Sequence, residues 1–266
     1  MSHTLATRLA LVTAVVSLPG CDLLALTDYL CLSQVLDIAD LDVDELKGAD
    51  ADARIKEALL LAEDVRGELP VMDCEAADSY SELLAAGGGT LVNAWSSGDV
   101  ADEAGQLIDD GVARGGEVAL VIDTTGSMQD DTLQLRRNID RVLAEVEQKN
   151  ARISVAFFGD NQSCDGQEWY HRNKGGLLSP DDDRIVKAAG NWEGALTGGC
   201  DWQESLYDAV WKTGTELEWE SDDRTIIVIT DAEAHETKTN HSESEVVGML
   251  KQQGIVLDTI LVGISF

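Results

Sequence analysis

Basic side chains are scarce in this chain of 266 residues, which carries 19 Lys and Arg against 50 Asp and Glu. The resulting net charge of −31 repels nucleic acid and anionic lipid, so we expect neither as a direct partner. The excess of acid runs through the whole sequence and is not confined to one tail. We therefore expect an acidic surface, suited to divalent cations, high salt or basic partners.

Long hydrophobic runs are also missing. The largely apolar stretch Leu9–Leu18 is shorter than the roughly 18 residues that a membrane helix needs, and it follows Arg8 as the apolar core of a signal peptide does. It ends at Gly20-Cys21, which resembles a bacterial lipobox, where the Cys is lipidated and becomes the mature N-terminus. We expect residues 1–21 to be a signal peptide. The mature protein would be anchored by lipid in the cell envelope, in the periplasm or at the cell surface.

The cysteines lack the Cys-x-x-Cys spacing of a zinc site. Apart from Cys21 there are four, and an exported protein is free to join them in disulfides. Four cysteines allow three connectivities. We favour Cys31–Cys74 with Cys164–Cys200, because each bond then stays within one half of the chain.

The region before residue 117 divides into two segments. Residues 22–87 are rich in Ala, Leu, Asp and Glu with apolar residues at helical spacing, which predicts a small helical region. Residues 88–116 form a linker or an edge strand: Thr90–Trp95 is the candidate strand, and the Gly- and Asp-rich stretch 96–116 predicts a loop.

From residue 117 onward, apolar strands alternate with amphipathic helices. This order predicts an α/β domain over residues 117–266, with a Rossmann-like parallel sheet and helices on both faces. In such sheets the functional site lies at the carboxyl ends of the strands. The expected strands are Val118–Asp123, Ile153–Phe158, Arg224–Asp231 and Ile255–Ile264.

Oxygen-bearing side chains gather where these strands end. Asp123, Thr125 and Ser127 occupy alternate positions of the turn after one strand, so their oxygens can converge on one hard cation. Asp231 ends another strand, and Asp201 follows a Gly-Gly-Cys turn. Carboxylate and hydroxyl ligands favour Mg²⁺, with Ca²⁺ or Mn²⁺ as alternatives.

These residues give the chain a family resemblance. Residues 117–266 resemble a von Willebrand factor type A domain with its metal-ion-dependent adhesion site. Asp123, Thr125 and Ser127 match the first motif of that site, Asp231 matches the last, and Asp201 stands where most members have Thr. The resemblance implies a non-catalytic domain that binds a protein or surface polymer through the metal. With three carboxylates the site would stay negative, which favours a neutral or basic partner.

Two further residues, Trp202 and His235, are candidate partner contacts beside this site. A metal-dependent hydrolase on the same sheet is one alternative, with His235 as its base. The sequence offers no Gly-x-Ser-x-Gly elbow and no phosphate-binding loop for it. A scaffold domain that binds no metal is the other alternative.

Overall fold

The structure is a computed structural model, and it describes residues 30–31, 71–72, 76–77, 80, 83–84, 88–160, 169–190, 203–235 and 239–263. Several sequence predictions lie outside these ranges: the signal peptide with Cys21, most of the N-terminal helical region, Cys74, Cys164, Cys200, Asp201 and Trp202. Cys31 is described only as part of the two-residue strand β1 (Leu30–Cys31), which pairs in parallel with β2 (Val71–Met72). The disulfide and lipidation predictions therefore stay predictions.

A six-stranded sheet forms the centre of the described structure, in the order β3-β8-β7-β4-β5-β6. All neighbouring strands are parallel except β5 and β6, which are antiparallel. The predicted mixed α/β fold with a mostly parallel sheet is thus confirmed. The strands are β3 (Leu91–Ala94), β4 (Glu117–Asp123), β5 (Arg152–Phe158), β6 (Tyr170–Arg172), β7 (Arg224–Thr230) and β8 (Ile255–Val262).

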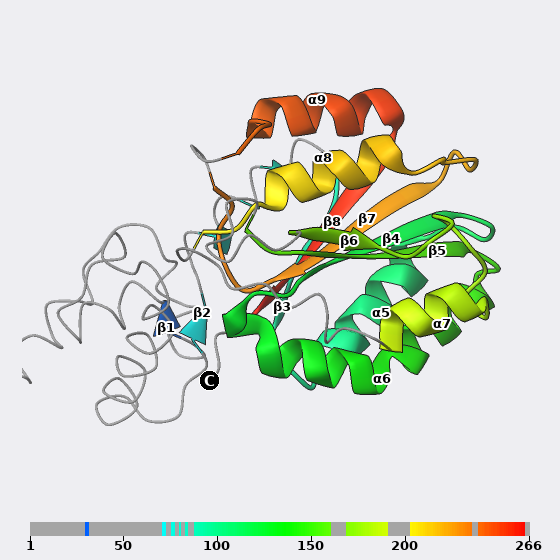
Figure 1. Ribbon diagram of the computed structural model, residues 1–266, viewed down its shortest axis with the longest axis horizontal. Helices are drawn as coiled ribbons and strands as arrows, with labels where there is room; N and C mark the ends of the chain where they lie inside the picture. Colours follow the sequence, from blue (N-terminus) through cyan, green and yellow to red (C-terminus); the bar gives the residue numbers. More distant parts are fainter. Residues whose placement is uncertain are drawn as a thin grey trace, which may run out of the picture.

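Five α-helices cover the two faces of this sheet in the part of the chain that the structure describes (Figure 1). On one face α5, α6 and α7 share a hydrophobic cluster with the sheet, and on the other face α8 and α9 share a second cluster. Both faces are covered, which is why a central strand such as β4 is buried along its whole length and reads as an apolar run. The helices are α5 (Val100–Gly111), α6 (Gln129–Gln148), α7 (Asp183–Gly190), α8 (Leu206–Glu216) and α9 (Glu243–Gln253).

The ends of α9 show how local sequence sets a boundary. Ser242 and Glu245 form a capping box at its start, where the Ser242 backbone N–H donates to the Glu245 carboxylate at 2.8 Å. Gly254 ends the helix with φ at 64°, a left-handed conformation that glycine adopts without steric cost. The chain then enters β8 directly, which brings this strand in beside β7.

The segment before β4 differs in part from the sequence prediction. The edge strand expected near residues 90–95 is present as β3, which pairs with β8. The stretch expected to be a loop instead contains the helix α5, so that expectation is wrong for Val100–Gly111. The Gly and Asp content of this stretch favours a loop, but its Asp residues lie on the exposed face of a helix and Gly105 lies on the buried face of that helix. Its buried face follows a helical spacing: Val100, Ala104, Leu107 and Ile108.

Part of the N-terminal region also packs against the domain. The described helical residues Ala76, Tyr80, Leu83 and Leu84 belong to the cluster that contains α8 and α9. The Tyr80 hydroxyl donates to the Ala232 carbonyl oxygen at 2.5 Å. None of the helices that the structure describes is long and apolar enough to cross a membrane.

Candidate functional site

The carboxyl ends of three adjacent strands, β7, β4 and β5, each carry a buried acid. Asp123 is the last residue of β4, Asp231 follows β7 directly, and Asp160 lies two residues beyond β5. None is more than 1 % exposed. Parallel strands end at the same edge of a sheet, so the topology gathers residues that lie far apart in the sequence, as the predicted site requires.

Hydrogen bonds join the motif residues to one another. The Asp123 Oδ1 atom accepts the backbone N–H of Thr125 at 2.9 Å and the Thr125 hydroxyl at 2.7 Å, while Oδ2 accepts the Thr230 hydroxyl at 2.7 Å. The short 3-10 turn Gly126–Met128 then places Ser127 so that its hydroxyl donates to Asp231 Oδ1 at 3.1 Å. The structure therefore brings together four of the five predicted ligands, and the fifth, Asp201, lies outside the described residues.

Glu204 is a further site residue that the sequence analysis missed. Its backbone N–H donates to the Glu233 carbonyl and its own carbonyl accepts the His235 N–H, both at 2.9 Å, which ties it to the chain after β7. Glu204 is 3 % exposed, and this burial raises its pKa, while a side-chain hydrogen bond with Thr125 opposes part of that rise. In the sequence, only its position three residues after Asp201 points to a role in the site. That indication is weak, because the chain has fifty acidic residues.

His235 lies on the inner side of this site. It was expected to contact a partner, yet its side chain is 1 % exposed and its Nε2 atom lies 3.6 Å from Asp160 Oδ1. Its Nδ1 atom is 3.3 Å from the Gln203 amide oxygen. Ser205 also donates to Asp160, at 3.2 Å. In this arrangement His235 contacts other residues of the site and offers almost no surface to a partner.

The buried acids oppose one another's ionisation. Burial raises the pKa of Asp123 and raises that of Asp231 well above its ordinary value, and the charge of Asp123 raises the latter further. Burial followed by the charges of Asp123, Asp160 and Asp231 also raises the pKa of Glu204 well above its ordinary value. Asp131, in the first turn of α6, has its pKa raised to about 8 by burial and by the neighbouring Asp130.

The donor set fits a hard divalent cation. Asp231 Oδ2 and Glu204 Oε2 are buried and have no hydrogen-bond partner among the described residues. An uncompensated buried carboxylate costs several kcal/mol, and a bound cation would remove that cost. Within the described ranges no three His, Cys, Asp or Glu side chains form a ready-made metal cluster. Hydroxyls and retained waters supply much of a Mg²⁺ shell, so the carboxylates need not touch one another.

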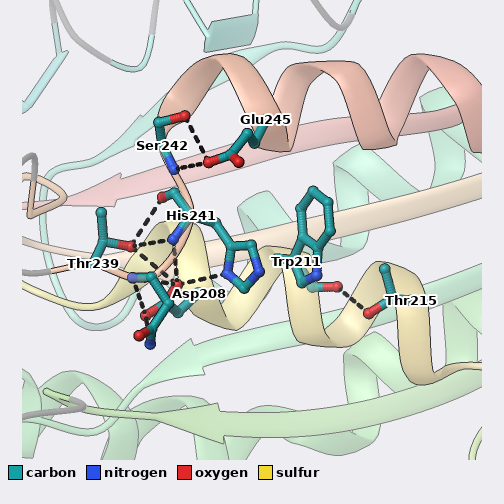
Figure 2. A network of polar contacts seen from close by, with 8 residues as sticks. Asp208, Trp211, Thr215, Thr239, His241, Ser242 and Glu245 are labelled. Carbon is teal, nitrogen blue, oxygen red and sulfur yellow. Dashed lines mark hydrogen bonds and ion pairs between the residues drawn. The ribbon is translucent and has the colours of Figure 1, made fainter.

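A network of polar contacts around Asp208 holds residues 239–241, just before α9 (Figure 2). The Asp208 carboxylate, on α8, accepts the backbone N–H groups of Asn240 and His241 and the side chains of Thr239, Asn240 and His241. The His241 ring stacks on Trp211 with centroids 4.3 Å apart. Burial alone would raise the pKa of Asp208, but these hydrogen bonds outweigh it and lower the pKa. Residues 239–241, which precede α9, are thereby fixed to α8.

Comparison with known proteins gives little beyond these observations. No family model matches the sequence, and no curated protein matches it. Among solved structures, the pilus adhesin SpaC from Lactobacillus rhamnosus GG, in its open conformation, is similar at 15% identity with a TM-score of 0.34. The match covers 44% of this chain and 14% of the adhesin chain. A likeness of this size assigns no function, so function has to be inferred from the residues of the site.

Proposed function

We propose that residues 117–266 are a von Willebrand factor type A domain that binds a divalent cation and, through it, a protein or a surface polymer. The observation that carries this proposal is the contact of Ser127 with Asp231, beside an Asp123 carboxylate already held by Thr125 and Thr230. These residues lie at the ends of two strands that are more than a hundred residues apart in the sequence. Their order along the chain is that of the adhesion-site motif.

The proposed ligands are oxygen donors. Thr125 and Ser127 would contribute hydroxyls, and Asp123 and Asp231 carboxylates, with Asp201 as the predicted fifth ligand. Glu204 supports the set from the loop that follows Asp201, with a buried oxygen that has no partner in the described structure. This chemistry suits Mg²⁺ first, and Mn²⁺ or Ca²⁺ as alternatives. The bound cation would supply a Lewis-acidic position to which an oxygen of the partner could coordinate.

The partner is proposed to be neutral or basic where it contacts the site. Asp123, Asp231 and Glu204 already exceed the charge of one divalent cation, and Asp201 would add another negative charge. The net charge of −31 acts in the same direction at longer range. In the exported, lipid-anchored form that the sequence predicts, this surface would face the periplasm or the exterior.

We propose no chemistry for the domain itself. The Ser127 hydroxyl donates to Asp231, while the Nε2 atom of His235 lies beside Asp160. Ser127, His235 and Asp231 therefore do not form the nucleophile–base–acid relay that a hydrolase of the serine type needs.

Calorimetric titration tests whether the domain binds a cation. Mg²⁺ or Mn²⁺ is titrated into the full chain after metal has been stripped with EDTA, at about 0.15 M salt so that surface carboxylates are screened. We expect saturable binding that Ser127→Ala weakens by about tenfold or more, since even residues that only support metal ligands cost that much when lost. Ser154→Ala is the matched control, because this buried serine of β5 donates to the Asn173 side-chain oxygen and its loss should not affect affinity. A folded, stripped wild-type chain that binds neither ion would overturn the proposal.

A further inference from the structure

Tyr80 connects the N-terminal region to the loop that carries Asp231. Its ring is fully buried in the apolar cluster that α8 and α9 share with the sheet, together with Leu83 and Leu84. Its hydroxyl donates to the Ala232 carbonyl oxygen at 2.5 Å, across 152 positions of the sequence. A residue from outside the predicted α/β domain therefore contacts the backbone directly after a proposed cation ligand.

The acceptor belongs to a short loop that carries part of the proposed cation site. Asp231 follows β7 directly, and the hydroxyl of Thr230, the last residue of that strand, holds the Asp123 carboxylate. The Ala232 backbone N–H donates to this same hydroxyl at 3.4 Å. A shift of the Ala232 backbone would therefore move Asp231 and disturb the hydrogen bond that holds Asp123.

Few other contacts hold this part of the loop. The loop is held at Ala234, which forms a parallel bridge with Glu204. At Ala232 the described residues offer the carbonyl one other donor, the Thr230 hydroxyl at 3.5 Å. That distance is at the limit of a hydrogen bond, whereas the bond from Tyr80 is short. Tyr80 is therefore the main contact that fixes this carbonyl within the described structure.

Tyr170 shows what a purely structural tyrosine does in the same cluster. It is also buried, and its hydroxyl lies 2.9 Å from the Thr213 hydroxyl. A buried Tyr hydroxyl usually finds such a partner, so a hydrogen bond by itself gives Tyr80 no special role. The two tyrosines differ in what their partners carry: Thr213 lies within α8, and Ala232 follows Asp231.

We infer that Tyr80 is a positioning residue of the cation site, which couples the N-terminal segment that contains it to cation binding. The inference rests on the proposed function for the cation. Tyr80 acts through the backbone, because its hydroxyl fixes Ala232 and thereby the neighbouring ligand Asp231. Coupling of this kind is reciprocal, so a bound cation also favours the docked position of the segment. The N-terminal region is thus part of the binding domain and not only a spacer.

Titration of Mn²⁺ into the metal-stripped full chain tests this inference by comparing Tyr80→Phe with its matched control, Tyr170→Phe. Each change removes one buried hydroxyl from the same cluster and keeps the ring, and circular dichroism confirms that each variant is folded. We expect Tyr80→Phe to raise the Kd for Mn²⁺ by about tenfold, as the loss of a residue that supports metal ligands does, and Tyr170→Phe to leave it unchanged. Both variants should melt at a lower temperature than the wild type in EDTA, because each leaves a buried polar group without its partner.

The outcomes separate this inference from the proposed function. If the wild type and a folded Tyr80→Phe bind Mn²⁺ with the same Kd, the positioning role is overturned and the cation site stands. An equal loss of affinity in Tyr170→Phe would also overturn it, because the loss would then reflect a general loosening of the cluster. Should Tyr80→Phe not fold, Leu84→Val, which loosens the same segment, takes its place with the same expected direction and the same refuting result. A folded wild type that binds no Mn²⁺ would overturn the proposed function and this inference with it.

Discussion

Neutralising Glu204 should have opposite effects on stability with and without a cation. In the metal-free chain Glu204 is a buried acid opposed by the charges of Asp123, Asp160 and Asp231. Glu204→Gln keeps the size of the side chain and removes that opposition, so the metal-free protein should become more stable. With a cation bound, the same change removes a neighbouring negative charge that favours the ion, so the bound protein should lose stability.

The sizes follow from burial and from linkage. Because the pKa of Glu204 is raised by burial, the metal-free fold at neutral pH loses about 1.4 kcal/mol for each pH unit above the ordinary Glu pKa, and Glu204→Gln should remove a cost of about 1–3 kcal/mol. A cation at about 100 times its Kd stabilises the wild type by about 2.7 kcal/mol. If Glu204→Gln weakens binding by about ten- to a hundredfold, as loss of a supporting residue does, half or more of that stabilisation disappears.

Thermal unfolding of the full chain in EDTA and in excess Mg²⁺ measures both effects. For a protein of this size each kcal/mol shifts Tm by about 2–4 °C, so the wild type should gain about 5–11 °C with Mg²⁺. Glu204→Gln should melt higher than the wild type in EDTA and gain only a few degrees from the ion. Glu117→Gln is the contrast, because this buried acid has partners at the other end of β4 and its loss should lower Tm equally in both buffers. An equal loss for Glu204→Gln in both buffers would refute the reasoning.

Three further predictions follow from charge. Because burial and Asp130 raise the pKa of Asp131 from 3.8 to about 8, the metal-free fold binds a proton that the unfolded chain releases, and its stability falls as pH rises through that window. Urea melts in EDTA should show that Asp131→Asn removes about 1.4 kcal/mol per pH unit of this decline between about pH 5 and pH 7; an unchanged slope would contradict it. The pKa of Asp208 is lowered, so its contribution to folding stability is present above the ordinary Asp pKa and is lost as pH falls below it. Asp208→Asn should destabilise the fold by about 2–4 kcal/mol at neutral pH, equally in EDTA and in Mg²⁺. A loss of stability seen only with Mg²⁺ would contradict a structural role for Asp208. Association of an acidic probe such as a polyglutamate peptide, followed by stopped flow, should slow as salt is lowered, and acceleration would contradict the proposed partner chemistry.

Much of the fold follows from short stretches of sequence. Apolar runs of strand length, each followed by a helical pattern, are enough to predict β4, β5, β7 and β8, because a parallel sheet covered on both faces needs strands of this kind. The rule that sites lie at the carboxyl ends of such strands then places Asp123 and Asp231 together. The helix α5 escaped prediction, because its stability comes from burying one face against α6 and the sheet.

The rest of the site depends on contacts that no local pattern records. Asp160 and Glu204 belong to no recognisable sequence motif, and they are two among fifty acidic residues. Their place in the site is set by the pairing of β4 with β5 and by the bridge between Glu204 and Ala234. Asp131 shows the same limit: in the sequence it is an ordinary first-turn acid of an amphipathic helix, and only its burial makes it unusual.

Protonation alone does not remove the difficulty that Asp131 poses. A neutral carboxyl group still carries an O–H that needs an acceptor and a carbonyl that needs a donor, and neither oxygen of Asp131 has a partner in the described structure. Leaving such groups buried costs about 1–3 kcal/mol each, even without charge. The cation proposed for the neighbouring site would offset the charge of an ionised Asp131 and the repulsion from Asp123. We therefore expect a bound cation to stabilise the acids at this edge of the sheet more than protonation alone does.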